Sequence, residues 1–112
     1  MSKSEREKGK RWERDVATRF REAMPGAEIK RGWQARSGSD AADVECPHFW
    51  IECKVGKRPP VVRALVQAEE ACGDGPLVPI AVVKQDRQEP TVTLRLADFL
   101  DFVREWWERG TA

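Results

Sequence analysis

The sequence predicts a single α/β domain in which helices flank a mixed β-sheet, in the order αβββαββα. The length of 112 residues suits one domain with one modest core. Hydrophobic residues make up 40% and charged residues 35%, a composition typical of a folded chain with a heavily charged surface. Segments with a helical period alternate with short segments of period two, which indicates helices and strands mixed along the chain.

The first predicted element is a helix over residues 4–24. With successive residues placed about 100° apart, its apolar side chains share one face: Trp12, Val16, Ala17, Phe20, Ala23 and Met24. Glu13 falls inside this apolar arc, which is an unusual place for a carboxylate. Pro25-Gly26 ends the helix.

Three strands are expected next. A short strand over residues 27–32 precedes a loop, residues 33–42, that is rich in small and turn-forming residues. Strands over residues 42–46 and 49–55 follow, and Pro47-His48 between them predicts a tight hairpin.

The second half of the chain repeats this alternation. Arg58-Pro59-Pro60 precedes a helix over residues 61–72, and strands follow over residues 77–84 and 91–96. Asp98 is expected to cap a last helix that extends to about residue 109. The apolar stripe of this last helix contains Phe99, Leu100, Val103, Trp106 and Trp107.

The residue census removes several classes of protein. The chain has no Tyr, so a tyrosine nucleophile is excluded, and a Ser-His-Asp hydrolase would depend on His48 alone. Cys46, Cys53 and Cys72 contain no Cys-x-x-Cys pair, which argues against a disulfide framework and a common zinc motif. The longest apolar run, residues 77–83, is too short to span a bilayer, and no secretory signal is recognisable. We therefore expect a cytoplasmic protein outside the membrane.

Charge is unevenly divided along the chain. Residues 1–63 carry 15 Lys and Arg against 10 Asp and Glu, a net charge of +5, whereas residues 64–112 carry 5 against 9, a net charge of −4. This asymmetry favours one basic face that binds a polyanion.

The predicted hairpin brings two acids together. With Pro47-His48 as a two-residue loop, Asp43 stands opposite Glu52, and Lys54 follows on the same face. Two like charges across a strand pair destabilise it by up to about 1 kcal/mol, and a divalent cation such as Mg²⁺ between them reverses that effect. An adjacent ammonium group can orient a water nucleophile or offset charge on a phosphate.

These residues resemble a known motif. Asp43 followed by Glu52-x-Lys54 is similar to the active site of the PD-(D/E)xK nuclease superfamily. The helix that contains Glu13 resembles the first helix of the archaeal-type Holliday junction resolvases, and both the loop Arg36-Ser37-Gly38-Ser39 and Gln67-Ala68-Glu69 resemble that family too. The resemblance covers roughly residues 8–84 and implies a restriction-endonuclease-like core.

The resemblance implies a Mg²⁺-dependent endodeoxyribonuclease, with Mn²⁺ as a substitute, that resolves four-way DNA junctions as a homodimer. The implied catalytic residues are Glu13, Asp43, Glu52, Lys54 and Gln67, and the implied metal ligands are Asp43, Glu52, Glu13 and the Cys53 carbonyl. Basic and small residues near this motif are candidate DNA contacts: Lys8, Lys10, Arg11, Arg14, Lys30, Arg31, Arg36, Ser37, Ser39, Lys57 and Arg58.

Other functions agree with the same residues. One is a nuclease of this superfamily that acts on duplex, flap or single-stranded DNA. Another is a non-catalytic nucleic-acid-binding protein of the same fold. Asp43, Glu52 and Lys54 would then be no more than the solvated face of an antiparallel strand pair.

Overall fold

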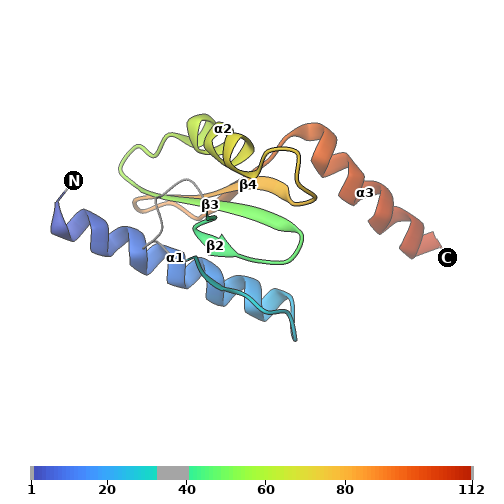
Figure 1. Cartoon of the computed structure of the whole chain (residues 1–112), viewed down its shortest axis with the longest axis horizontal. Coiled ribbons are helices and arrows are strands. Elements are labelled where there is room, and N and C mark those ends of the chain that lie inside the picture. The colour runs from blue at the N-terminus through green and yellow to red at the C-terminus, as the bar shows by residue number, and fades with distance from the viewer. Residues whose placement is uncertain (1, 33–40, 112) are drawn as a thin grey trace.

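The computed structural model describes residues 2–32 and 41–111, and these form three helices and five strands in the predicted order (Figure 1). The α/β class and the order αβββαββα are therefore confirmed. In chain order the elements are α1 (Lys3–Ala23), β1 (Lys30–Arg31), β2 (Val44–Glu45), β3 (Phe49–Gly56), α2 (Val61–Cys72), β4 (Val78–Gln85), β5 (Thr91–Thr93) and α3 (Leu96–Thr111).

The five strands form one mixed sheet with the spatial order β1-β2-β3-β4-β5. β3 and β4 are parallel, and the other neighbouring pairs are antiparallel. α2 makes the crossover that parallel neighbours require. α1 and α2 cover opposite faces of the sheet (Figure 1).

Each face of the sheet has its own hydrophobic cluster. The larger cluster lies under α1, where Trp12 packs with Ile51 and Cys53 of β3. The smaller cluster lies under α2 and consists of Ala64, Leu65, Ala81 and Val83. Period-two alternation along β3 therefore points Ile51 and Cys53 toward α1 and leaves Glu52 and Lys54 on the α2 side.

α1 is anchored at its start and in its middle. The Ser2 hydroxyl accepts the N–H of Glu5 at 3.2 Å, which caps the helix one residue earlier than expected. The indole Nε1 of Trp12 donates to the carbonyl of Val82 in β4 at 3.2 Å. Ala23, expected on the apolar face, is exposed instead.

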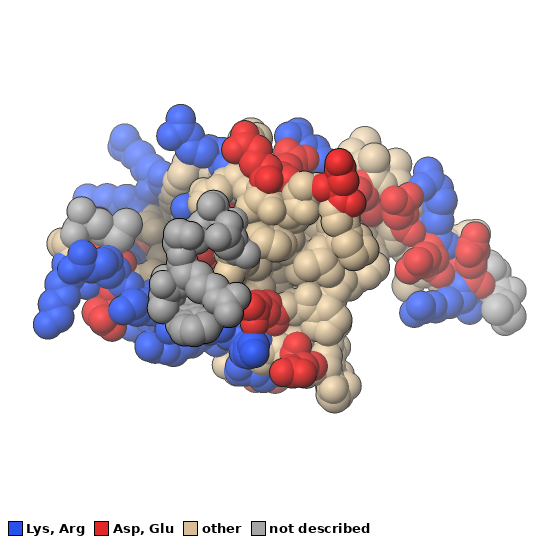
Figure 2. Space-filling model, viewed as in Figure 1, with Lys and Arg blue, Asp and Glu red and all other residues tan. Residues whose placement is uncertain are grey.

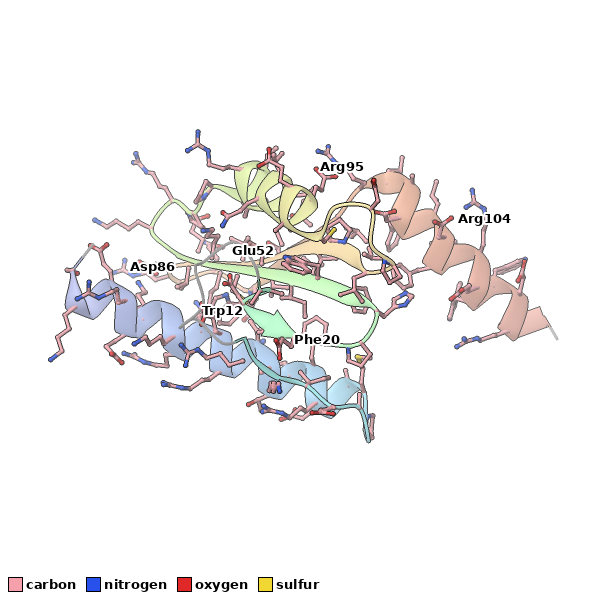
Figure 3. The ribbon with its side chains drawn as sticks, viewed as in Figure 1. Trp12, Phe20, Glu52, Asp86, Arg95 and Arg104 are labelled. Carbon is pink, nitrogen blue, oxygen red and sulfur yellow. The ribbon has the colours of Figure 1, made fainter. Side chains whose placement is uncertain are left out.

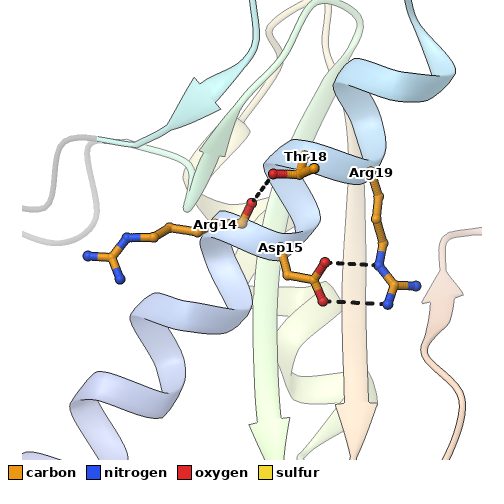
Figure 4. Close-up of polar contacts among 4 residues, drawn as sticks. All are labelled: Arg14, Asp15, Thr18 and Arg19. Atoms are coloured by element: carbon orange, nitrogen blue, oxygen red, sulfur yellow. Dashed lines mark hydrogen bonds and ion pairs between the residues drawn. The ribbon is translucent and has the colours of Figure 1, made fainter.

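The solvent side of α1 is polar. Asp15 pairs with Arg19 one turn later, at 3.2 Å, and the Thr18 hydroxyl donates to the carbonyl of Arg14 at 3.0 Å (Figure 4). The Arg14 guanidinium points away from this group of contacts (Figure 4). A side-chain ion pair one helical turn apart, such as that of Asp15 with Arg19, adds modest stability to a helix.

Several strands are shorter than predicted. β1 and β2 each contain two residues, and β5 ends at Thr93 because the chain turns into α3 at Leu96, two residues before the expected cap at Asp98. The Arg95 guanidinium binds the Glu69 carboxylate of α2 at 2.8 and 2.9 Å. This ion pair holds the start of α3 beside α2.

α3 projects away from the sheet and from both other helices (Figure 1). Phe102 anchors it, with its ring stacked on Phe49 at 5.4 Å and edge-on to His48 at 5.2 Å. His48 occupies the predicted turn with a φ of 80°. Among the described residues, no helix is long and apolar enough to cross a bilayer.

Candidate functional site

The candidate site lies where the β2–β3 hairpin stops pairing. Val44 pairs with Ile51 and Glu45 with Trp50, which is the register expected from a two-residue turn. The N–H of Asp43 also donates to the carbonyl of Ile51, at 3.0 Å. Asp43 and Val44 therefore both oppose Ile51, as in a β-bulge, a feature that redirects side chains next to active sites.

The bulge aims the Asp43 side chain along β3. Its Oδ2 accepts the backbone N–H of Cys53 at 2.8 Å, a position that a carbonyl of a longer β2 would otherwise fill. Asp43 was expected to pair directly with Glu52 across the hairpin. Its carboxylate instead binds the backbone N–H of Cys53, the residue that follows Glu52.

A cavity of about 750 Å³ lies beside the second half of β3. Within the described residues no strand flanks this half of β3 on the β2 side, so side chains from both faces of the sheet reach the cavity. α1 lines it from one face and α2 from the other. All five predicted catalytic residues line it: Glu13, Asp43, Glu52, Lys54 and Gln67.

Glu52 is the buried charged residue of the described core, with 6% of its surface exposed (Figure 3). The pKa of its carboxyl is raised to about 8, chiefly because a carboxylate loses its hydration on burial. The negative charge of Asp43 and a side-chain hydrogen bond with Asp43 contribute to this rise, while Lys54 opposes it. Two acidic groups thus share one site that favours a proton or a cation between them.

Glu13 reaches the same cavity from α1. Its Oε1 accepts the Nε–H of Arg31 at 2.9 Å. Burial raises the pKa of Glu13, the hydrogen bond from Arg31 lowers it, and the negative charge of Asp43 raises it again. The Glu13 carboxylate, which falls within the apolar arc of α1, therefore lies in the same cavity as Asp43 and Glu52.

The Cys53 side chain lies in the core under α1 and its backbone lies at the cavity. Burial raises the pKa of the Cys53 thiol, and the charges of Asp43, Glu13 and Glu52 raise it further. The thiol is therefore protonated and unreactive at neutral pH. The backbone of Cys53 is the part of this residue that can take part in chemistry.

Basic side chains line the cavity together with the acids. Figure 2 shows Lys and Arg gathered around the first half of α1, whereas acidic and basic side chains are mixed along α3. Four of the predicted DNA contacts line the cavity: Lys8, Lys10, Arg31 and Lys57. Lys8 also pairs with Asp86, after β4, at 2.7 Å.

Three charged residues of the lining were not anticipated: Glu5, Arg6 and Asp86. Arg6 precedes Glu13 by seven residues and so lies on nearly the same side of α1, a relation that the helical period could have revealed. Asp86 is brought to the cavity by the end of β4, and no local pattern near it indicates this.

Other predicted DNA contacts lie elsewhere. Arg11 and Arg14 are exposed on α1 and lie outside the cavity lining. Lys30 pairs with Glu45 at 3.6 Å, and Arg58 lines a separate cavity of about 480 Å³. Arg36, Ser37 and Ser39 lie outside the described residues.

The oxygen-rich pair at the centre of the cavity suits a hard divalent cation. The Glu52 carboxyl, whose pKa is raised, lies beside the Asp43 carboxylate, and Mg²⁺ prefers carboxylate oxygens. No three Asp, Glu, His or Cys residues of the described ranges stand close enough to hold an ion unaided. Mg²⁺ usually retains waters and binds one or two carboxylates together with substrate phosphates, so the pair fits this ion.

The raised pKa of Glu52 predicts a pH-dependent stability without divalent cations. The folded protein keeps this proton up to about pH 8, whereas the unfolded chain releases it near 4.5. In EDTA the free energy of unfolding should therefore fall as the pH rises between these values and level off above them. Thermal unfolding of the wild type and of Glu52→Gln across this range measures the effect. An equal slope in both proteins would contradict the assignment to Glu52.

No known protein family, curated protein or solved structure matches the chain. The functional assignment therefore rests on the residues and geometry of the site itself.

Proposed function

We propose that the protein is a metal-dependent endodeoxyribonuclease that acts on branched DNA, with four-way junctions as its substrate. The observation that carries this proposal is the convergence of acids from three separate segments in one cavity: Glu13, Asp43 and Glu52. Lys54 and Gln67 line the same cavity, and so do basic side chains. The resemblance to junction-resolving nucleases supplies the choice of substrate.

Each group then has a role. Asp43 and Glu52 would hold Mg²⁺ or Mn²⁺ together with waters and a substrate phosphate, and the resemblance adds Glu13 and the Cys53 carbonyl as further ligands. The ion would supply Lewis acidity to the scissile phosphate. The Lys54 ammonium group orients the attacking water and offsets charge that develops on the phosphate. Lys8, Lys10 and Lys57 neutralise phosphates on either side of the cut, which makes binding sensitive to salt.

The substrate also implies an assembly. A four-way junction contains two equivalent strands related by a twofold axis, and both must be cut for resolution. Two copies of one chain related by the same symmetry satisfy this requirement. We therefore propose that the active nuclease is a homodimer.

The test is cleavage of three DNAs of matched sequence: a four-way junction, a linear duplex and a single strand, each with Mg²⁺, Mn²⁺ or EDTA. We expect paired, symmetric nicks in the junction alone, in either metal and not in EDTA. Equal cleavage of all three DNAs would contradict the substrate and leave a general nuclease. Junction binding without cleavage in either metal would contradict the catalytic proposal.

A further inference from the structure

Much of the apolar face of α3 is exposed in the described part of the chain. Trp106, Leu96 and Trp107 have 71%, 70% and 63% of their surfaces exposed, and Phe99 has 50%. Phe102 touches Phe49 and His48 from the edge of this face. Contiguous apolar surfaces of this kind mark sites of association in water-soluble domains.

The apolar positions of α3 follow the spacing of a helix-packing seam. Leu96, Phe99, Val103, Trp106 and Gly110 succeed one another at intervals of three, four, three and four residues. This spacing places them in one line along the helix, as at the a and d positions of a coiled coil. Leu100 and Trp107 widen the line on one side. A second helix is the natural partner for such a face.

We infer that this α3 face packs against the same face of a second copy of the chain. An aromatic side chain can bury about 150–250 Å², so the exposed aromatic and leucine side chains of α3 together offer roughly 500 Å² per copy. A twofold contact buries the same surface on both copies, which gives about 1,000 Å² in total. That area reaches the size at which specific interfaces begin.

This interface supplies the surface for the homodimer of the proposed function, but it stands on the exposed face of α3 alone. Its failure is therefore distinguishable from that of the nuclease: the association state is measured without DNA or metal, and cleavage is measured separately.

The test is analytical ultracentrifugation of the full chain at about 10–100 µM, above the micromolar Kd at the weak end of standard-sized interfaces. We expect the wild type to sediment as a dimer and Trp106→Glu as a folded monomer. Val62→Glu is the matched control, because Val62 is an equally exposed apolar residue, at 66%, on α2. A monomeric wild type would overturn the inference, whether or not it binds lipid vesicles. A dimer that persists in the Trp106→Glu variant would also overturn it.

Discussion

Glu52→Gln is expected to abolish DNA cleavage and to leave the protein folded and able to bind a four-way junction. The amide has nearly the same shape as the carboxyl but cannot become an anion. The shared site with Asp43 then loses the charge that favours a cation. We expect a rate at least about 10³-fold lower, the scale at which an active site loses a principal electrostatic group. Single-turnover cleavage and gel-shift binding of the same junction measure the two properties.

Glu45→Gln is the matched control for this variant. Glu45 lies in the same hairpin, where it is exposed and pairs with Lys30 at 3.6 Å outside the cavity. Its replacement should change the cleavage rate less than about twofold, because exposed ion pairs contribute little. A Glu52→Gln protein that cuts at the wild-type rate would show that the site assignment is wrong, and so would an equal loss in both variants.

Gly32→Ala adds one methyl group and is expected to destabilise the fold strongly. The N–H of Gly32 donates to the carbonyl of Asp43 at 2.8 Å, and a Cβ at this position would overlap the backbone carbonyl of Ala42. Backbone must move to admit it, so we expect a loss near the upper end of overpacking effects, about 3 kcal/mol. The melting temperature should fall by roughly 10 °C or more. Cleavage should fall as well, because the displaced segment carries Asp43.

Gly9→Ala gives the opposite expectation and serves as the control. Gly9 lies within α1 at the lining of the cavity, and a Cβ there meets no atom within 4 Å. Alanine should stabilise the helix by up to about 1 kcal/mol, since glycine is the poorer helix former. Thermal unfolding of both variants decides the matter: a Gly32→Ala protein as stable as Gly9→Ala would contradict the close approach of Gly32 to Ala42.

The sequence was sufficient to predict the element order and the register of the hairpin, because both depend on local signals. The hydrophobic period changes between helices and strands, and Pro47-His48 marks the turn that sets Val44 opposite Ile51. The α2 bounds, Val61–Cys72, agree with the prediction because prolines precede this helix and a glycine cluster follows it. These features need no knowledge of the rest of the chain.

The details of the site depend on tertiary contacts and could not be predicted this way. Strand alternation alone places Asp43 across from Glu52, whereas the side chain of Asp43 competes with the backbone for the N–H of Cys53 and ends the regular pairing. Asp86 enters the cavity lining from the distant end of β4. The apolar period of α3 was predicted, but periodicity does not distinguish a face buried in its own domain from one left uncovered.

The hydrogen bond from Trp12 to the carbonyl of Val82 has a consequence for its neighbour in the chain. α1 cannot roll about its own axis without breaking that bond, and adjacent residues of a helix are separated by about 100° around the axis. A rotation of that size would move Glu13 away from Asp43. The hydrogen bond of the Trp12 indole to β4 therefore fixes the rotation of α1 and with it the position of the Glu13 carboxylate.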